Sequence, residues 1–345
     1  MKRIFLVILC LPLFFLDGKN IMAKEDLIRI NNKNFPDLFF QTYIKEKYDK
    51  DGDGKLSKKE RKRVLSISVG EYSDYQLEYE YPPVESLQGI EFFPELKYIN
   101  CSGSSLDSLD VTKNTKLRTL ICNSNELKRL DVSSNKNLEM LNCSENKIAK
   151  LTLKKNRNLI ELFCGENRVK KLDVSRNEKL KVLSIEKNKL KKISVTKLKK
   201  LQSLTCSFNE ITRLNLRSNR RLDTLYCTGN KLKKLDLRNN KLLQYLYCQS
   251  NQLIDGNCFL TKSQLSSCES SPQKQTIRVK KIGKYYYIPI KGINRTNEIT
   301  NLSAGVMTEK GIRLKGKKLP KKITYEYNMF TDGEKKTKVE IKVKK

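Results

Sequence analysis

The sequence of 345 residues contains no histidine, and this absence excludes several kinds of chemistry. Cys-His and Ser-His-Asp nucleophilic catalysis both need an imidazole base, and many zinc sites need imidazole ligands. No convergent pair of acidic residues offers another general acid and base. We therefore expect that the protein is not an enzyme.

Acidic residues are few compared with basic ones. The chain has 70 Lys and Arg against 38 Asp and Glu, a formal net charge of +32. Such an excess draws a protein to polyanions through a salt-sensitive attraction. Lysine-rich usage throughout a low-GC genome would give the same composition, so the position of the charge on the fold has to decide between the two.

Long apolar runs are confined to the start of the sequence. Met1-Lys2-Arg3 precedes IFLVILCLPLFFL, an apolar segment of about 13 residues that is short for a membrane span. This pattern predicts a secretory signal peptide over residues 1–23, with a retained anchor as the alternative. No second apolar stretch and no sortase-type LPxTG tail follow, so we expect no transmembrane segment in the mature chain, which would be released or held noncovalently at the cell surface.

Between Leu96 and Gln264 the sequence repeats every 21 residues. Eight segments share the pattern LxxLxCxxNxLxxLxVxxNxx, in which Ile, Val and Leu interchange at the apolar places. A short fixed period with a regular set of leucines and one asparagine is typical of a leucine-rich-repeat solenoid. Coils of this length leave too little chain for a full outer helix, so we expect a narrow, mostly β solenoid of about eight coils.

Within each coil the residues around LxC alternate as they do in a β-strand. In the fourth coil Leu162 and Cys164 should point inward, while Glu161, Phe163 and Gly165 should point to solvent. Eight such strands should form one parallel sheet.

An asparagine follows each strand where the chain turns inward, and its amide can satisfy backbone groups that the turn leaves inside. Stacked on one another, these residues should form an asparagine ladder. The expected members are Asn125, Asn146, Asn167, Asn188, Asn209, Asn230 and Asn251.

A cysteine occupies the last inward position of the strand in seven coils, and Ile185 occupies it in the fifth. A slot that accepts isoleucine favours buried thiols that act as small apolar residues, rather than redox or metal chemistry. Ladder positions in a parallel stack point the same way, so we expect no disulfides between coils. The cysteines are Cys101, Cys122, Cys143, Cys164, Cys206, Cys227 and Cys248.

Two surfaces of the predicted solenoid differ in charge. The residue before the second inward leucine is cationic in six coils, which predicts a basic stripe along one flank that could hold a polyanion. The concave face is nearly uncharged and carries aromatic side chains that suit protein or glycan recognition, although scattered aromatics are also ordinary on a solenoid. The stripe comprises Arg129, Lys150, Lys171, Lys192, Arg213 and Lys234, and the candidate partner-binding residues are Tyr98, Met140, Phe163, Tyr226, Tyr245 and Tyr247.

Residues 49–60, DKDGDGKLSKKE, match the twelve-residue calcium loop of an EF-hand. Alternate carboxylates can wrap around a hard cation, a backbone carbonyl adds an oxygen, and the last glutamate can close the site with both oxygens. The motif is single and many cations surround it, so we expect weak binding of a structural Ca²⁺ at extracellular concentrations. A metal-free turn held by Asx bonds is the alternative. The expected ligands are Asp49, Asp51, Asp53, Lys55 through its carbonyl, Ser57 and Glu60.

Flanking helical patterns place this loop in an N-terminal cap over residues 24–95, ahead of a solenoid over 96–268. After Pro272 short alternating segments predict a small antiparallel β-sandwich over 272–345. Cys258 and Cys268, which lie outside the ladder, could form a disulfide or remain buried thiols. We expect one face of the sandwich to carry Ile323, Tyr325 and Tyr327, and another to carry Val339, Ile341 and Val343.

The coil LRTLICNSNELKRLDVSSNKN resembles the cysteine-ladder repeats of internalin J and related secreted proteins of Gram-positive bacteria. The lead-in NFPDLFFQTYIKEKYDKDGDGKLSKKE is similar to the N-terminal region of such proteins, and ITNLSAGVMTEKGIRLKGKKLPKKITYEY resembles the immunoglobulin-like unit after their repeats. The resemblance implies a secreted or cell-surface module for adhesion or host contact. This sequence lacks the wall-sorting tail and the repetitive stalk of the internalins.

Two functions follow as hypotheses. The first is an extracellular, adhesin-like module that binds a protein or glycan ligand on the concave sheet. The second is a basic protein that binds an anionic polymer such as teichoic acid or a glycosaminoglycan and is retained at the cell surface by charge. Nucleic acid is not an expected partner, because of the leader and the uncharged concave sheet.

Overall fold

The computed structural model describes most of the chain, and no helix in the described part is long and apolar enough to cross a membrane. The predicted signal peptide and Cys258 of the predicted Cys258–Cys268 bridge lie outside the described residues. The described ranges are 26–70, 83–253, 265–289, 299–308, 311–315, 319–328 and 336–344.

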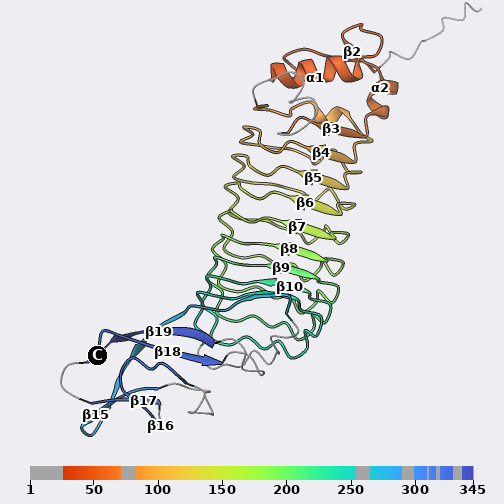
Figure 1. Ribbon diagram of the computed structural model, residues 1–345. Helices are drawn as coiled ribbons and strands as arrows, with labels where there is room; N and C mark the ends of the chain where they lie inside the picture. Colours follow the sequence, from red (N-terminus) through yellow and green to blue (C-terminus); the bar gives the residue numbers. More distant parts are fainter. Residues whose placement is uncertain are drawn as a thin grey trace, which may run out of the picture.

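A parallel sheet of ten short strands runs the length of the solenoid (Figure 1). Each strand pairs with the next in the same register, so that Leu141 lies opposite Leu120 on one side and Leu162 on the other. The predicted leucine-rich-repeat solenoid is therefore confirmed, with one further strand at each end of the eight repeats. The strands are β3 (Ser66–Ser68), β4 (Tyr98–Asn100), β5 (Thr119–Ile121), β6 (Met140–Asn142), β7 (Glu161–Phe163), β8 (Val182–Ser184), β9 (Ser203–Thr205), β10 (Thr224–Tyr226), β11 (Tyr245–Tyr247) and β12 (Ser267–Glu269).

The interior of the solenoid is a continuous stack of apolar side chains. Leu162 and Cys164 point inward and are buried, and Glu161 and Phe163 are partly exposed, as the alternation predicts. The prediction for Gly165 is wrong, because this residue is buried. The chain has already turned inward after the strand, and a Cβ on Gly165 would lie 2.5 Å from a carboxylate oxygen of Glu186, which covers it.

The N-terminal unit closes the first end of this stack. Asp37 caps the first helix by accepting a hydrogen bond from the Phe40 backbone N–H at 2.8 Å. Phe35, Phe40 and Phe93 are fully buried and join the core of the solenoid, so the unit shields the first coil from water. Its elements are β1 (Ile28–Arg29), α1 (Leu38–Tyr48), β2 (Lys55–Leu56), α2 (Lys58–Arg63) and the 3₁₀ helix η1 (Ile90–Phe92).

The C-terminal unit contains a three-stranded and a four-stranded sheet, with strand orders β13-β19-β18 and β14-β15-β17-β16. The bounds are β13 (Gln273–Arg278), β14 (Lys280–Ile282), β15 (Tyr285–Ile288), β16 (Val306–Thr308), β17 (Gly311–Lys315), β18 (Lys322–Asn328) and β19 (Lys336–Lys344).

Two details of the predicted sandwich are wrong. The sheets are not wholly antiparallel, because β13 and β19 pair in parallel. The two predicted apolar faces are one face, since Ile323 lies opposite Ile341 and Tyr325 opposite Val339 in neighbouring strands of the same sheet. The alternation of buried and exposed residues within each strand agrees with the prediction, but this alternation does not determine which distant strands pair. The immunoglobulin-like classification stays a prediction.

Hydrogen bonds join this unit to the last coil. Gln273 continues the asparagine ladder: its Oε1 accepts from the Leu253 N–H at 3.1 Å, and its Nε2 donates to the Cys248 carbonyl at 3.0 Å. The buried Tyr327 hydroxyl donates to the Leu253 carbonyl at 2.8 Å. The second end of the solenoid is therefore covered by packed and hydrogen-bonded protein.

Candidate functional site

The asparagine ladder holds the strand ends in place and so fixes the surface beside them. In the third coil Asn146 Nδ2 donates to the carbonyls of Cys122, Cys143 and Ser144 at 2.9, 3.2 and 3.0 Å. Its Oδ1 accepts from the Leu127 N–H at 2.9 Å. Equivalent bonds recur from the second coil to the eighth, so the amide satisfies buried backbone groups, as predicted. The members are Asn125, Asn146, Asn167, Asn188, Asn209, Asn230 and Asn251.

A second asparagine ladder lies on the convex side, where no such role was predicted. Asn135 Nδ2 donates to the carbonyls of Val111 and Asn114, both at 2.9 Å, but its Oδ1 has no hydrogen-bond partner. Leu198 occupies the equivalent position of the fifth coil and is also fully buried. The second asparagine of the repeat pattern was a visible signal of this ladder. Its members are Asn114, Asn135, Asn156, Asn177, Asn219 and Asn240.

The cysteine ladder is buried, and its surroundings suppress thiol reactivity. The seven ladder cysteines are at most 1% exposed, and Ile185 is equally buried in the same column. Burial raises the pKa of the Cys101 and Cys206 thiols to about 12, and it raises those of Cys122 and Cys143 well above the ordinary value. A protonated, inaccessible thiol is neither a nucleophile nor a metal ligand at neutral pH. The ladder therefore acts as core packing.

One residue of each coil, at the rim just after the strand, has a left-handed backbone. Six of the eight are not glycine and have φ between 48° and 56°. Phe208 stands out among them, because its side chain is 55% exposed and packs over Gly229 of the next coil. The rim residues are Gly103, Ser124, Glu145, Glu166, Lys187, Phe208, Gly229 and Ser250.

The six candidate partner-binding residues all lie on the outward face of the sheet, and the largest group that the structure brings together contains three of them. Tyr226 and Tyr247 are paired residues of β10 and β11, and their rings lie 4.8 Å apart at 58°. Tyr245, two residues before Tyr247, is 39% exposed. We call these three residues the tyrosine cluster. Met140 and Phe163 lie diagonally across the neighbouring strands β6 and β7, and Tyr98 lies apart from both groups on β4.

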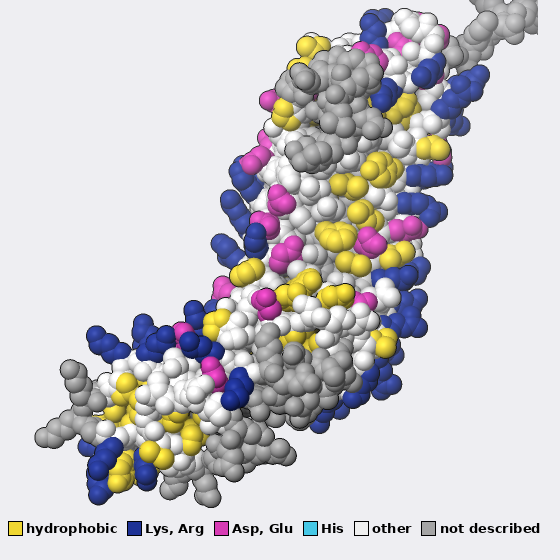
Figure 2. Space-filling model, in the orientation of Figure 1, with side chains coloured by type: hydrophobic (Ala, Val, Ile, Leu, Met, Phe, Trp, Pro, Cys, Tyr) yellow, Lys and Arg dark blue, Asp and Glu magenta, His cyan; other side chains and the backbone are white. Residues whose placement is uncertain are grey.

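The predicted cationic column lies on the solenoid surface, and we call it the basic flank. All six of its side chains are exposed, and none makes a salt bridge with a described residue. Several cations of other columns are paired, as Lys231 is with Glu210 at 3.0 Å. Figure 2 shows Lys and Arg side chains along one long edge of the solenoid. The members are Arg129, Lys150, Lys171, Lys192, Arg213 and Lys234.

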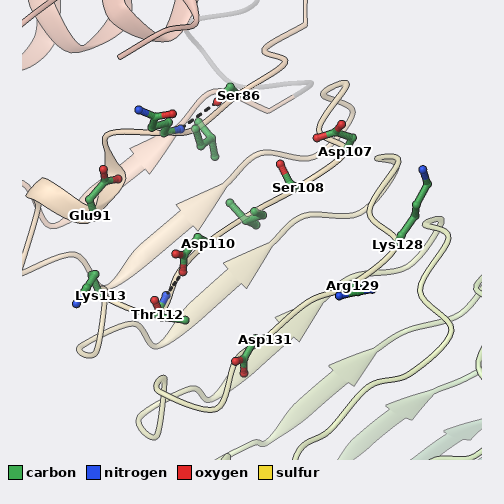
Figure 3. A pocket seen from close by; sticks show the side chains of 13 residues that line it. Ser86, Glu91, Asp107, Ser108, Asp110, Thr112, Lys113, Lys128, Arg129 and Asp131 are labelled. Atoms are coloured by element: carbon green, nitrogen blue, oxygen red, sulfur yellow. Dashed lines mark hydrogen bonds between the residues drawn. The ribbon is translucent and has the colours of Figure 1, made fainter. Parts of the chain in front are cut away.

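The flank is not uniformly basic along its length. At the N-terminal end, Arg129 lines a groove of about 840 Å³ that carries four carboxylates and three cations (Figure 3). Over coils three to five, a hollow of about 500 Å³ is lined by five lysines and a single carboxylate, that of Asp173. The positive potential is therefore concentrated from the third coil onward. The five lysines are Lys150, Lys154, Lys170, Lys171 and Lys192.

The predicted calcium loop brings three of its expected ligands together. Asp49, Asp51 and Asp53 each present a carboxylate oxygen, and these oxygens lie within 4.8 Å of one another. Asp49 is only 8% exposed, and its Oδ1 has no hydrogen-bond partner, while its Oδ2 accepts from the Gly54 N–H at 3.0 Å. A buried carboxylate oxygen without a donor fits a cation, so these residues suit calcium.

The remaining expected ligands make other contacts. Glu60 accepts hydrogen bonds from the Lys50 and Ser57 backbone N–H groups at 2.7 and 2.9 Å, and Ser57 caps α2. Burial alone would raise the pKa of Glu60, but these hydrogen bonds outweigh it and lower the pKa. Lys55 Nζ lies 3.2 Å from Asp53 Oδ2. Glu60 and Ser57 thus stabilise the loop and its following helix.

Comparison with known proteins supports the fold. No protein-family model and no curated protein matches the chain. Internalin C2 of Listeria monocytogenes matches with a TM-score of 0.53 and 18% identity, over 71% of this chain and 97% of that one. Internalin F of the same species matches with a TM-score of 0.45 and 21% identity, over 72% and 86%. The functional domain of internalin J from Listeria monocytogenes, described as including a cysteine ladder, covers 93% and 99% at 20% identity, with a TM-score of 0.32.

Proposed function

We propose that this chain, an internalin-like leucine-rich-repeat solenoid, is an extracellular binding module rather than an enzyme, and that it holds a protein or glycan ligand on its concave face. The tyrosine cluster carries the proposal. Tyrosine offers a large apolar contact with a polar tip and few rotatable bonds, so it binds at a low entropic cost. The ladder beneath it satisfies the buried backbone, which keeps the sheet rigid before the ligand arrives.

The cluster combines rings of different exposure with nearby hydrogen-bonding groups. Tyr247 is held by a hydrogen bond of 2.7 Å between its hydroxyl and that of Ser267. Tyr245 presents the more open ring, and Asp223 and Gln244 belong to the same two coils. An aromatic surface beside carboxylate and amide groups suits a sugar ring or an extended peptide.

The test is capture of ligands by wild-type protein and by the Tyr226→Ala, Tyr245→Ala variant, using a glycan array and extracts of bacterial and host-cell surfaces. Binding should fall by at least tenfold, since central aromatic residues contribute about 2 kcal/mol or more each. Leu242→Ala is the matched control, because Leu242 is 58% exposed but lies outside the outward face of the sheet. Capture that survives the tyrosine substitutions in a folded variant contradicts the proposal.

A second function is favoured by the unpaired cations of the basic flank. The hollow over coils three to five would hold an anionic polymer by charge, without recognising a sequence. Retention on an anionic matrix should weaken steeply between low and high salt. Lys150→Gln, Lys171→Gln, Lys192→Gln should elute earlier than wild type, and salt-independent retention would refute this function.

We also propose that the loop of residues 49–60 binds a structural Ca²⁺ through Asp49, Asp51 and Asp53. A cation there would neutralise three neighbouring carboxylates and fasten the N-terminal unit over the first coil. Millimolar Ca²⁺ should raise the thermal midpoint of wild-type protein but not that of Asp49→Asn. Asp107→Asn, which removes an exposed carboxylate elsewhere, should respond as wild type does. Calorimetry without a binding heat in wild-type protein would exclude the site.

A further inference from the structure

A second basic surface lies where the solenoid meets the C-terminal unit, and we call it the junction groove. It is a hollow of about 650 Å³ lined by five lysines and one carboxylate, Glu340, so the lining has a net formal charge of +4. Its residues come from the seventh and eighth coils and from the three-stranded sheet, so neither unit forms it alone. The lysines are Lys233, Lys274, Lys321, Lys322 and Lys342.

Strand register explains why the cations gather on this face. In β13, β18 and β19 the alternate residues Ile277, Ile323 and Ile341 are buried. The other set therefore faces outward, and it contains Lys274, Lys322 and Lys342. Lys274 N donates to the Asn251 carbonyl at 2.9 Å, which fixes β13 beside the last ladder asparagine.

The charges in the groove are not balanced. Lys322 and Lys342 are paired residues of neighbouring strands, and like charges placed directly opposite each other destabilise a sheet. Glu340 bonds to Lys322 at 3.0 Å, so this pair is satisfied. Lys233, Lys274 and Lys342 are exposed and form no salt bridge with a described residue, and the same holds for Lys321. Lys274 lies opposite Glu340 in the neighbouring strand, so this one carboxylate is shared by two lysines. Repulsion of this kind would be relieved by a bound anion.

The groove adjoins the basic flank through consecutive residues, because Lys233 lines the groove and Lys234 ends the flank. Neighbouring strands of a sheet lie about 4.8 Å apart, so the flank from Lys150 to Lys234 spans roughly 20 Å over four coil steps. One cation per coil, leading into a groove of several, suits a chain of regularly spaced anions better than a small molecule.

We propose that the junction groove is an anion-binding site that holds one segment of a linear polyanion. This polymer carries phosphate or sulfate groups at short intervals, and the rest of it follows the basic flank. The site is independent of the concave face. It gives the second proposed function a defined anchoring point, and it rests on that function only for the path of the polymer beyond the groove.

The test uses full-length protein and three triple variants. Lys233→Gln, Lys274→Gln, Lys342→Gln removes three of the four groove lysines that make no salt bridge with a described residue. It leaves Lys321 and the Lys322–Glu340 pair in place. Lys150→Gln, Lys171→Gln, Lys192→Gln changes the flank. Lys136→Gln, Lys199→Gln, Lys241→Gln is the control: it removes the same charge from exposed lysines that share another position of the repeat, outside both the groove and the basic flank. Binding of polyphosphate, heparin and tripolyphosphate is measured against salt concentration.

The groove variant should bind polyphosphate roughly ten- to thirtyfold more weakly at about 0.1 M salt, and the slope of log K against log salt should fall by about 2–3. The control variant should change binding far less. Without ligand, the groove variant should keep its thermal midpoint, because relief of the repulsion between Lys342 and Lys322 offsets the lost attraction between Lys274 and Glu340. Lysine-to-arginine substitution at the same three positions should preserve binding.

Equal losses in the groove and control variants would overturn the site, since the attraction would then be delocalised. A loss of binding confined to the flank variant would also refute the proposed site in the junction groove, although it would agree with the second proposed function. Tripolyphosphate should bind wild type more weakly than the long polymer and should lose affinity only in the groove variant. Comparison of polyphosphate with heparin tells whether phosphate or sulfate is preferred.

Discussion

Replacing one asparagine in each ladder by leucine should destabilise the protein to very different extents. Asn146→Leu removes an acceptor from the buried Leu127 N–H and a donor from the buried carbonyls of Cys122 and Cys143. A buried backbone group left without a partner costs about 1–3 kcal/mol. The N–H has no second acceptor nearby, whereas the carbonyls of Cys122 and Cys143 each keep a donor, Asn125 Nδ2 at 3.3 Å and Asn167 Nδ2 at 2.9 Å. Adding about 1 kcal/mol for each lost carbonyl bond to the cost of the abandoned N–H, we expect a loss of about 3–5 kcal/mol in the free energy of unfolding.

Asn135→Leu should cost only about 1–2 kcal/mol. It removes hydrogen bonds to two carbonyls, but it also removes an Oδ1 that is buried without a partner, and no N–H is abandoned. Leu198 already fills the same column in the fifth coil, so leucine fits there. The two substitutions are matched in residue type, in depth and in distance from the solenoid ends.

Equilibrium urea unfolding, followed by far-UV circular dichroism at 10 °C, gives both free energies. The slopes with urea should agree between variants, which shows that the same amount of structure unfolds. Costs that agree within about 0.5 kcal/mol would refute the claim that the fully bonded ladder determines stability. A larger cost for Asn135→Leu would refute it more strongly.

Three further predictions concern titration and packing. The unfolded Cys101 thiol ionises near 9.0 and the folded one near 12, so the unfolded state binds fewer protons in between. The free energy of unfolding should therefore fall as pH rises from about 9 to 12, by about 1.4 kcal/mol per pH unit for each such thiol. Urea unfolding of Cys101→Ala should show a shallower fall with pH than that of wild-type protein. Cys143→Ser should cost about 2 kcal/mol of stability because it buries a hydroxyl, whereas Ile185→Cys should cost about 1–2 kcal/mol and fold normally. Full stability of the Cys143→Ser variant would argue against a simple packing role for the cysteines. Glu60 has a lowered pKa when folded, so its contribution is present above 4.5 and disappears as pH falls through the folded value. Glu60→Gln should therefore be less stable than wild type at pH 7 by about 1–3 kcal/mol and should approach it at low pH, and an unchanged difference across this range would contradict the assignment.

The repeat made the solenoid predictable in detail, because a period of 21 fixes which residues stack. Leu162, Cys164 and Asn167 all lie where the pattern places them. The same argument failed at Gly165, where the chain leaves the strand and the alternation no longer applies. It also missed the bonds of Asn135, although the pattern contains that asparagine, since both of its carbonyl partners lie in the preceding coil and none lies in its own.

Surfaces built within one repeat column were easier to predict than surfaces built between units. The basic flank follows from residues 21 apart, and its exposure agrees with the prediction. The junction groove unites Lys233 with Lys274 and Lys342, and nothing in their spacing brings them together. The parallel pairing of β13 with β19 creates that face, and pairing between strands so distant in sequence cannot be read from alternation alone.

The ladder bonds recur at fixed separations of 24 and 19 residues, so each coil from the second to the eighth makes the same connections to its neighbours. Deleting or duplicating 21 residues by recombination would restore every one of these bonds at the new joint. The solenoid can thus gain or lose whole coils, and each coil changes its length by about 4.8 Å. Related genes can lengthen or shorten both the concave face and the row of cations beside it, while the two end units and the fold stay as they are.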